Sequence, residues 1–231
     1  MSIGYLLQFT FAVLLNLGVI VCLARGPFRR FPLVLFFCLL QIVLSSGSNV
    51  IFFYLKSLTL YSKWYWGGDL IGHVCISFII ISIIREALVG KPERNRIALG
   101  LITFMVGVAV VSLILFHAPQ LNRWMTPVSR NLSFGEEVLN LVLWSLLLQR
   151  NDFDSQFLIV SAGIGIQVTG EVVGHTLRLY TTKSTIWIPS LLVTLSEFLC
   201  LIVWIWAFSS IPGKTKALDT PDSRTNLKPA I

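Results

Sequence analysis

Long apolar stretches separated by short polar segments run along almost the whole chain. A helix needs about 20 residues to cross about 30 Å of hydrocarbon. Windows of that length fit residues 3–24, 33–55, 66–86, 97–116, 132–149, 157–179 and 188–209. The pattern predicts an all-α fold, a polytopic membrane protein with a seven-transmembrane-helix bundle over residues 1–211. Residues 212–231 are polar and broken by proline, which is typical of a disordered tail.

The composition agrees with this pattern. Hydrophobic residues make up 55% of the chain and charged residues 13%, whereas about 25% of a soluble domain is charged. The first apolar stretch lacks the charged start and the small-residue cleavage site of a signal peptide. We therefore expect it to remain as the first helix, and we expect no separate soluble domain.

The distribution of basic residues predicts how the chain is threaded. The connections after the first, third and fifth stretches, together with the tail, are richer in Lys and Arg than the other connections. The first group is Arg25, Arg29, Arg30, Arg85, Lys91, Arg94, Arg96, Arg150, Lys214, Lys216, Arg224 and Lys228, and the second is Lys56, Lys63, Arg123, Arg130, Arg178 and Lys183. Cytoplasmic loops carry the excess of basic residues. We expect the N-terminus outside and the tail in the cytoplasm.

The net charge of +7 is explained by the lipid bilayer, because basic residues on the cytoplasmic side lie beside anionic headgroups. A nucleic-acid partner is not needed. The cysteines, Cys22, Cys38, Cys75 and Cys200, all fall within apolar stretches. The sequence therefore contains no disulfide framework and no zinc knuckle.

Two apolar stretches contain titratable pairs, Asp69 with His73 and Glu171 with His175. A charged side chain costs about 2.5–3.5 kcal/mol at the bilayer centre, so such residues normally face the bundle interior and serve a function. At 1.5 Å per residue, Asp69 and His175 lie about 6–7 Å below the outer surface, and His73 and Glu171 about 12–13 Å below it. The two pairs should share the same levels.

Further polar residues extend this set. Gln167, Glu171, His175 and Arg178 lie on one face of the sixth helix at 100° per residue. The second helix adds Asn49 and the seventh adds Glu197. We predict a polar cavity, open to the outer side, between the second, third, sixth and seventh helices. Its candidate ligand- or proton-binding residues are Asp69, His73, Gln167, Glu171, His175, Arg178, Glu197 and Asn49.

Two local motifs lead to predictions about packing and about a helix start. Gly68 and Gly72, like Gly170 and Gly174, have the small-xxx-small spacing that brings helices close in lipid, and both pairs belong to a G-[DE]-x-x-G-H pattern. We expect the third and sixth helices to pack closely there. The spacing from Ser133 to Glu136 fits a capping box, which predicts that the fifth helix begins near residue 133 and carries Glu136 and Glu137 in its first turn.

Three interpretations of the titratable residues remain open. In the first, they hydrogen-bond each other and Arg178, and the protein is a structural scaffold. In the second, they bind a small molecule, an ion or a proton from the outer side, since histidine titrates near neutral pH. In the third, they form an intramembrane metal- or acid-dependent active site of the hydrolase or cyclase type. We take the second as the leading hypothesis, with a membrane or cytoplasmic protein partner receiving any signal.

We expect no cofactor, with zinc as the alternative. His73, His117 and His175 with nearby carboxylates form a workable zinc set, but no HExxH or HxxxH motif supplies two histidines from one helix. Retinal is excluded, because residues 188–209 contain no lysine for a Schiff base. P-loop, dinucleotide-binding glycine and GxSxG motifs are also absent from the sequence.

Three segments, RRFPLVLFFCLLQ, YSKWYWGGDL and IIREAL, give the sequence a resemblance to a known group. In these segments the chain resembles an uncharacterised family of bacterial seven-helix membrane proteins, and the likeness runs over most of the chain. The resemblance implies an acid at the position of Asp69, a seven-helix topology and a location in the bacterial inner (cytoplasmic) membrane. It implies no activity.

Overall fold

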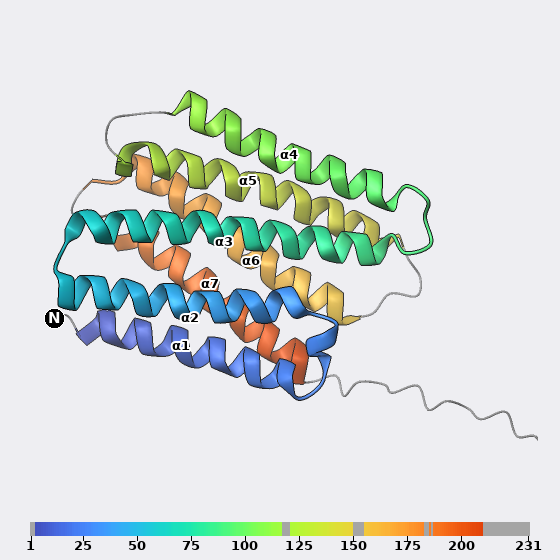
Figure 1. Ribbon diagram of the computed structural model, residues 1–231, viewed down its shortest axis with the longest axis horizontal. Helices are drawn as coiled ribbons and strands as arrows, with labels where there is room; N and C mark the ends of the chain where they lie inside the picture. Colours follow the sequence, from blue (N-terminus) through green and yellow to red (C-terminus); the bar gives the residue numbers. More distant parts are fainter. Residues whose placement is uncertain (1–2, 117–120, 150–154, 183–184, 186, 210–231) are drawn as a thin grey trace, which may run out of the picture.

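Seven α-helices lie side by side along one long axis, and successive helices run in opposite directions (Figure 1). The computed structural model describes residues 3–116, 121–149, 155–182, 185 and 187–209. The predicted tail, residues 212–231, lies outside the described residues. The helices are α1 (Ile3–Ala24), α2 (Pro32–Val50), α3 (Leu58–Ala87), α4 (Arg94–Leu115), α5 (Leu121–Leu148), α6 (Ser155–Tyr180) and α7 (Trp187–Ser209). A 3-10 turn, η1 (Pro27–Arg29), precedes α2, and a π-helical turn, η2 (Ile51–Leu55), follows it.

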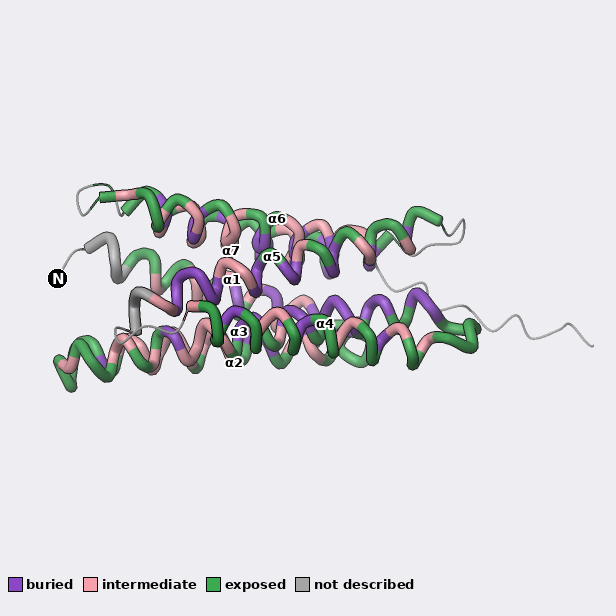
Figure 2. The backbone as a smooth tube through the Cα atoms, turned by 90° about the horizontal axis from the view of Figure 1, so that it is seen from above, coloured by how far each residue is buried: buried purple, intermediate pink, exposed green. Residues whose placement is uncertain are grey.

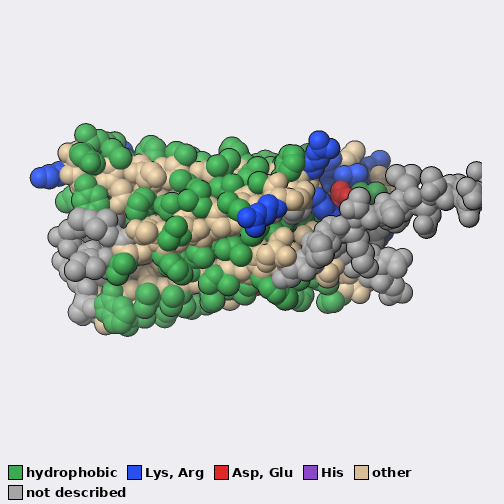
Figure 3. All heavy atoms as spheres, turned by 90° about the horizontal axis from the view of Figure 1, so that it is seen from below, with side chains coloured by type: hydrophobic (Ala, Val, Ile, Leu, Met, Phe, Trp, Pro, Cys, Tyr) green, Lys and Arg blue, Asp and Glu red, His purple; other side chains and the backbone are tan. Residues whose placement is uncertain are grey.

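Six of these helices, all except α5, are long and apolar enough to cross a membrane. Large apolar side chains such as Leu14, Phe36, Val106 and Leu199 are exposed on their outer faces. Figure 3 shows this apolar surface along the body of the molecule, with most visible Lys and Arg side chains toward one end. So large an exposed apolar surface is unfavourable in water. The all-helical fold expected from the sequence is therefore confirmed, and six of its helices could cross a membrane, which indicates a multi-pass membrane protein.

Two helices begin well before the apolar windows that predicted them. The α3 helix begins at Leu58, where the Ser57 side chain accepts a hydrogen bond from the Leu60 backbone N–H at 3.3 Å and so satisfies one free donor of the first turn. Lys56, with a φ of 49°, makes the turn from η2 into this cap. The α5 helix begins at Leu121. The predicted start near residue 133 is wrong, because residues 121–132 are also helical and most side chains from Met125 to Leu132 are packed inside the bundle.

The order of packing makes α5 the bridge between α3 and α6. It packs against α3, α4 and α6, whereas α3 and α6 touch each other at only a few positions. On the other side, α7 packs against α6 and α1, and α2 lies between α1 and α3. Buried residues accordingly line the facing sides of the helices (Figure 2). A side chain on the inner face of α5 can therefore reach both α3 and α6.

The two glycine pairs bring neighbouring helices together, but not the pair that the sequence indicated. A Cβ added at Gly68 would lie 3.2 Å from the Leu44 side chain of α2, and one added at Gly170 would collide with Ser196 of α7. The second glycine of each pair faces the same neighbour as the first. The prediction that these glycines join α3 to α6 is wrong, because their small surfaces are used within the sequential hairpins α2–α3 and α6–α7.

The interior differs between the two ends of the bundle. Toward the α1–α2 and α3–α4 connections it is apolar, with Trp204 fully buried and its indole N–H donating to the Val160 carbonyl at 3.0 Å. The Phe37 ring packs against this indole edge to face, with 5.9 Å between centroids. Toward the other end, near the start of α3, buried polar side chains replace this apolar core. The candidate site lies there.

Candidate functional site

His73 in α3 is the centre of a buried cluster of acids. Its Nδ1 atom lies 3.1 Å from Oε2 of Glu136 in α5 and 3.8 Å from Oε2 of Glu171 in α6. On the other side of the ring, Nε2 lies 3.7 Å from Oδ2 of Asp69, one turn earlier in α3. The imidazole is 4% exposed and Glu136 is 0% exposed. Three carboxylates from three helices thus surround one histidine.

Each glutamate of the cluster accepts a hydrogen bond at Oε1, the carboxyl oxygen on the far side from His73. Ser77 donates to Oε1 of Glu136 at 3.2 Å. Gln167 donates to Oε1 of Glu171 at 3.0 Å from one turn earlier in α6. The Oε2 atoms of both glutamates are left facing His73. These hydrogen bonds to the Oε1 atoms therefore fix the orientation of the two carboxyl groups.

Two serines of α5 complete the cluster. Ser129 makes a short hydrogen bond to Oδ2 of Asp69, and Ser133, one turn later, donates to Oε2 of Glu171 at 3.3 Å. The Ser133 hydroxyl also lies 3.0 Å from the Ser129 carbonyl oxygen. Both serines are fully buried. The inner face of α5 thus positions acids of both α3 and α6.

Glu136 is the member of the cluster whose position the sequence pattern predicted wrongly. As a first-turn acid it would face water, but α5 begins at Leu121 and Glu136 lies in its interior, fully buried. A signal for this was present, because five polar residues recur at helical spacing on one face of α5. All are buried: Thr126, Ser129, Ser133, Glu136 and Asn140. A polar stripe of this length indicates a helix that faces other helices rather than lipid.

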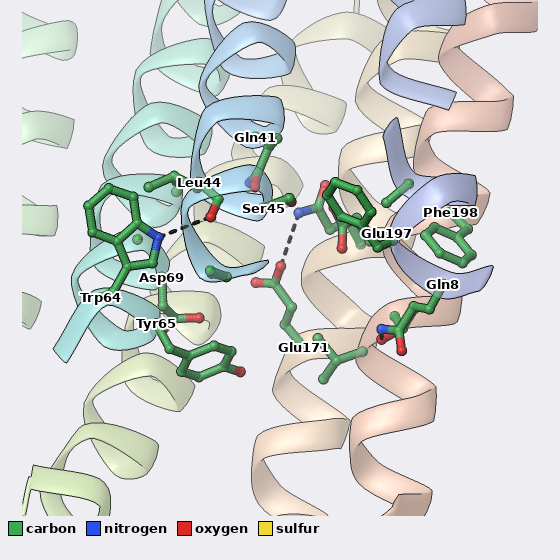
Figure 4. A pocket seen from close by; sticks show the side chains of 18 of the residues that line it. Gln8, Gln41, Leu44, Ser45, Trp64, Tyr65, Asp69, Glu171, Glu197 and Phe198 are labelled. Atoms are coloured by element: carbon green, nitrogen blue, oxygen red, sulfur yellow. Dashed lines mark hydrogen bonds between the residues drawn. The ribbon is translucent and has the colours of Figure 1, made fainter. Parts of the chain in front are cut away.

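A cavity of about 270 Å³ lies beside the cluster (Figure 4). It is bounded by α2, α3, α6 and α7, the helices expected from the sequence, and also by the start of α1. Its polar lining includes Gln8, Gln41, Ser45, Ser48, Asn49, Asp69, His73, Gln167, Glu171, Thr194 and Glu197, and its aromatic lining Phe9, Tyr61, Trp64, Tyr65 and Phe198. Glu136 is not among the lining residues and lies behind them.

The acids of the cavity wall come from three helices. Asp69, Glu171 and Glu197 all line the cavity, and none of the described lining residues is Lys or Arg. Glu197, half-buried at mid-length in α7, has no hydrogen-bond partner among the residues that the structure describes. Carboxylates that line one low-dielectric hollow produce a negative potential there. The cavity is therefore suited to a positively charged occupant.

An aromatic wall closes the cavity on the α2–α3 side. The Trp64 indole N–H donates to the Leu44 carbonyl oxygen at 3.0 Å, which fixes the ring (Figure 4). The ring lies directly over Gly47, where an added Cβ would collide with it. Tyr61 and Tyr65, one turn apart in α3, stack with 6.5 Å between centroids. The Trp64 ring is thus held in place, and all three rings line the cavity.

The remaining predicted residues lie outside the His73 cluster. Asn49 lines the cavity and donates to the Ser45 carbonyl oxygen at 2.8 Å. His175 is buried with an unpaired Nδ1 atom and does not line the cavity. Arg178 donates to the Ser190 hydroxyl at 3.2 Å, and no ion pair joins it to the cluster within the described part of the chain. His117 lies outside the described residues.

Comparison of this chain with protein-family models, with curated proteins and with solved structures finds no match. The described residues offer an acid cluster around His73 and an adjoining acidic and aromatic cavity.

Proposed function

We propose that this protein binds a small, positively charged solute in the cavity and serves as a membrane binding or sensing protein. The observation that carries the proposal is the convergence of Asp69, Glu171 and Glu197 on one cavity whose described lining contains no Lys or Arg. A bound cation offsets the cost of burying these carboxylates, which is large for an unpaired charge. An anion would be repelled by the same groups.

The aromatic lining indicates which kind of cation fits the cavity. Tyr61, Trp64 and Tyr65 offer ring faces, and a cation over such a face gains about 0.5–2 kcal/mol, most when it is desolvated. The volume of about 270 Å³ is close to the lower end of small-molecule sites, which begin at about 300 Å³. A small organic ammonium ion fits both features.

We place the cavity on the outer side of a bacterial inner membrane. The support is the charge distribution, because the connections after α1 and α3 carry Arg25, Arg29, Arg30 and Lys91 at the end of the bundle opposite the cavity. Basic connections favour the cytoplasm. In this proposal α5 also crosses the membrane, giving seven spans with the N-terminus outside, and its polar stripe is shielded by α3 and α6.

A metal- or acid-dependent enzyme is the second candidate, and the proximity of His73, Glu136 and Glu171 favours it. A scaffold without a ligand would use the same hydrogen bonds only to fix helix register. These alternatives differ in what the purified protein binds. Neither alternative predicts that the protein binds a cation more tightly than the uncharged isostere of that cation.

Glu197→Gln tests the cavity directly. Because Glu197 makes no hydrogen bond to any described residue, the change removes charge without breaking such a bond, and we expect normal folding. Binding of choline or tetramethylammonium to detergent-purified protein, measured by calorimetry, should weaken at least about tenfold, which corresponds to about 1.4 kcal/mol. Dimethylbutanol, the uncharged isostere of choline, should bind poorly to both proteins.

Glu137→Gln is the matched control, because Glu137 lies in α5 outside the cavity and accepts a hydrogen bond from Thr169 at 3.2 Å. Its cation affinity should equal that of the wild type. If neither ammonium ion binds the wild type, or if both glutamine variants bind alike, the proposed function is wrong.

A further inference from the structure

We propose that His73, Glu136 and Glu171 hold a divalent metal ion of the zinc class at the inner wall of the cavity. The inference rests in part on the proposed function, because His73 and Glu171 also line the cavity. Glu136 does not line it, so the metal site and the organic-cation site can be tested separately. The metal site joins α3, α5 and α6.

Three ligand atoms, one each from α3, α5 and α6, converge at this point. One nitrogen of His73 and one oxygen each of Glu136 and Glu171 lie within 4.8 Å of one another. Zinc binds histidine nitrogen and carboxylate oxygen at about 2.0–2.2 Å, so two ligands of one ion are separated by roughly 3–4 Å. The distances of 3.1 and 3.8 Å from Nδ1 to the two Oε2 atoms lie in this range.

Further polar side chains lie beyond the three ligands and face their outer atoms. A metal-bound histidine usually donates its other ring N–H to a carboxylate or carbonyl, and ligating carboxylates are themselves hydrogen-bonded. Here Nε2 of His73 faces Asp69 at 3.7 Å. The far oxygen of Glu136 is held by Ser77, and that of Glu171 by Gln167. Both glutamates therefore have an outer hydrogen-bond partner, and the outer nitrogen of the histidine faces a carboxylate.

The Nε2 atom of His73 is buried and unpaired among the described residues. If Nδ1 carries the proton for Glu136, then Nε2 is a buried acceptor without a hydrogen-bond partner among the described residues. It would then face the Asp69 carboxylate, another acceptor. A metal on Nδ1 moves the proton to Nε2, where it points toward Asp69. One ion thus gives both ring nitrogens a partner.

Charge and donor type indicate which ion fits. A neutral imidazole and two carboxylates carry a charge of −2, which a divalent ion neutralises in a setting where unpaired charge is costly. Imidazole suits zinc and other first-row transition metals, whereas calcium and magnesium prefer sites built entirely of oxygen. Three protein ligands would leave a position for a non-protein ligand, as in catalytic zinc sites, and two of the three, His73 and Glu171, line the cavity.

The test is the metal content of the full-length protein, purified in detergent with zinc present and then desalted. We expect one zinc per chain in the wild type and in Glu137→Gln. Glu136→Gln should lose at least nine tenths of it, because an amide oxygen is a much weaker ligand. Cobalt added to the stripped wild type should give visible absorption bands that are missing in Glu136→Gln.

Ser77→Ala keeps the result informative even if Glu136→Gln does not fold. This change leaves all three ligands in place and removes only the donor to Oε1 of Glu136, so zinc affinity should fall 10–100-fold, the usual effect of losing an outer partner. The wild type without bound zinc, or equal zinc content in Glu136→Gln and Glu137→Gln, would overturn the metal site. Choline binding that persists without zinc would leave the proposed function standing.

Discussion

Glu136→Ala is expected to destabilise the protein by about 2–6 kcal/mol, because it leaves two buried groups, the imidazole and the Ser77 hydroxyl, without this partner, and each unsatisfied group costs about 1–3 kcal/mol. Glu136 is 0% exposed and contacts both His73 and Ser77. Its loss leaves the imidazole beside a void and the Ser77 hydroxyl without its acceptor. The free energy of unfolding, measured by titrating the protein in mixed micelles with sodium dodecyl sulfate, reports this effect.

Glu137→Ala provides the comparison for this experiment. Glu137 is the next residue of α5, but it is half-buried and its contact with Thr169 lies at the surface. A hydrogen bond in such a place contributes about 0.5–1.5 kcal/mol. Equal losses in the two variants would show that Glu136 is not the buried link between α3 and α5.

Gly170→Ala should have the next largest effect. The added methyl group would collide with Ser196 of α7, and such overpacking costs about 1–3 kcal/mol. Forcing α6 away from α7 also moves Glu171, the next residue, relative to Glu197 on the opposite wall. We therefore expect both a lower free energy of unfolding and weaker choline binding, measured by the same micelle titration and calorimetry.

Gly107→Ala is the control for the glycine prediction. Gly107 lies on the exposed side of α4, and a Cβ added there meets no atom within 4 Å. Alanine is favoured over glycine in a helix by about 1 kcal/mol, so this variant should be as stable as the wild type or more so. A stable Gly170→Ala protein would contradict the close packing of α6 and α7.

The helices whose apolar windows cover nearly their whole length could be predicted from sequence alone. For α4, α6 and α7 the apolar windows end within a few residues of the observed helices. The starts of α3 and α5 could not be predicted in this way, because the mean hydropathy of a window detects lipid-facing surface and not the helix itself. Ser57 caps α3 before its apolar part begins, and the early part of α5 carries polar side chains, such as Thr126 and Ser129, that are nevertheless buried inside the bundle.

The candidate site was predictable in the same uneven way. Asp69, His73 and Glu171 stood out because titratable side chains are rare within apolar stretches, and the structure brings them together. Glu136 was missed because its local spacing from Ser133 also fits a helix cap. Helix contacts decide between these readings, and a single sequence does not specify which helices pack together.

The same limit explains the glycine pairs. Spacing of small residues shows that a helix face permits close approach, but it does not name the partner helix. In the fold, Gly68 faces α2 and Gly170 faces α7, so the repeated G-[DE]-x-x-G-H pattern marks two hairpins rather than one helix pair. Each hairpin nevertheless carries the acid of its pattern to the cavity, Asp69 from the first and Glu171 from the second.

The central claim is that His73 and Glu136 form the buried link by which α5 joins α3 at the cavity. The most direct test is a double-mutant cycle, in which the free energy of unfolding is measured for the wild type, His73→Ala, Glu136→Ala and the double variant. Residues in direct contact show coupling of about 0.5–3 kcal/mol, and we predict at least about 1 kcal/mol here. Losses that simply add, with coupling near zero, would contradict the account.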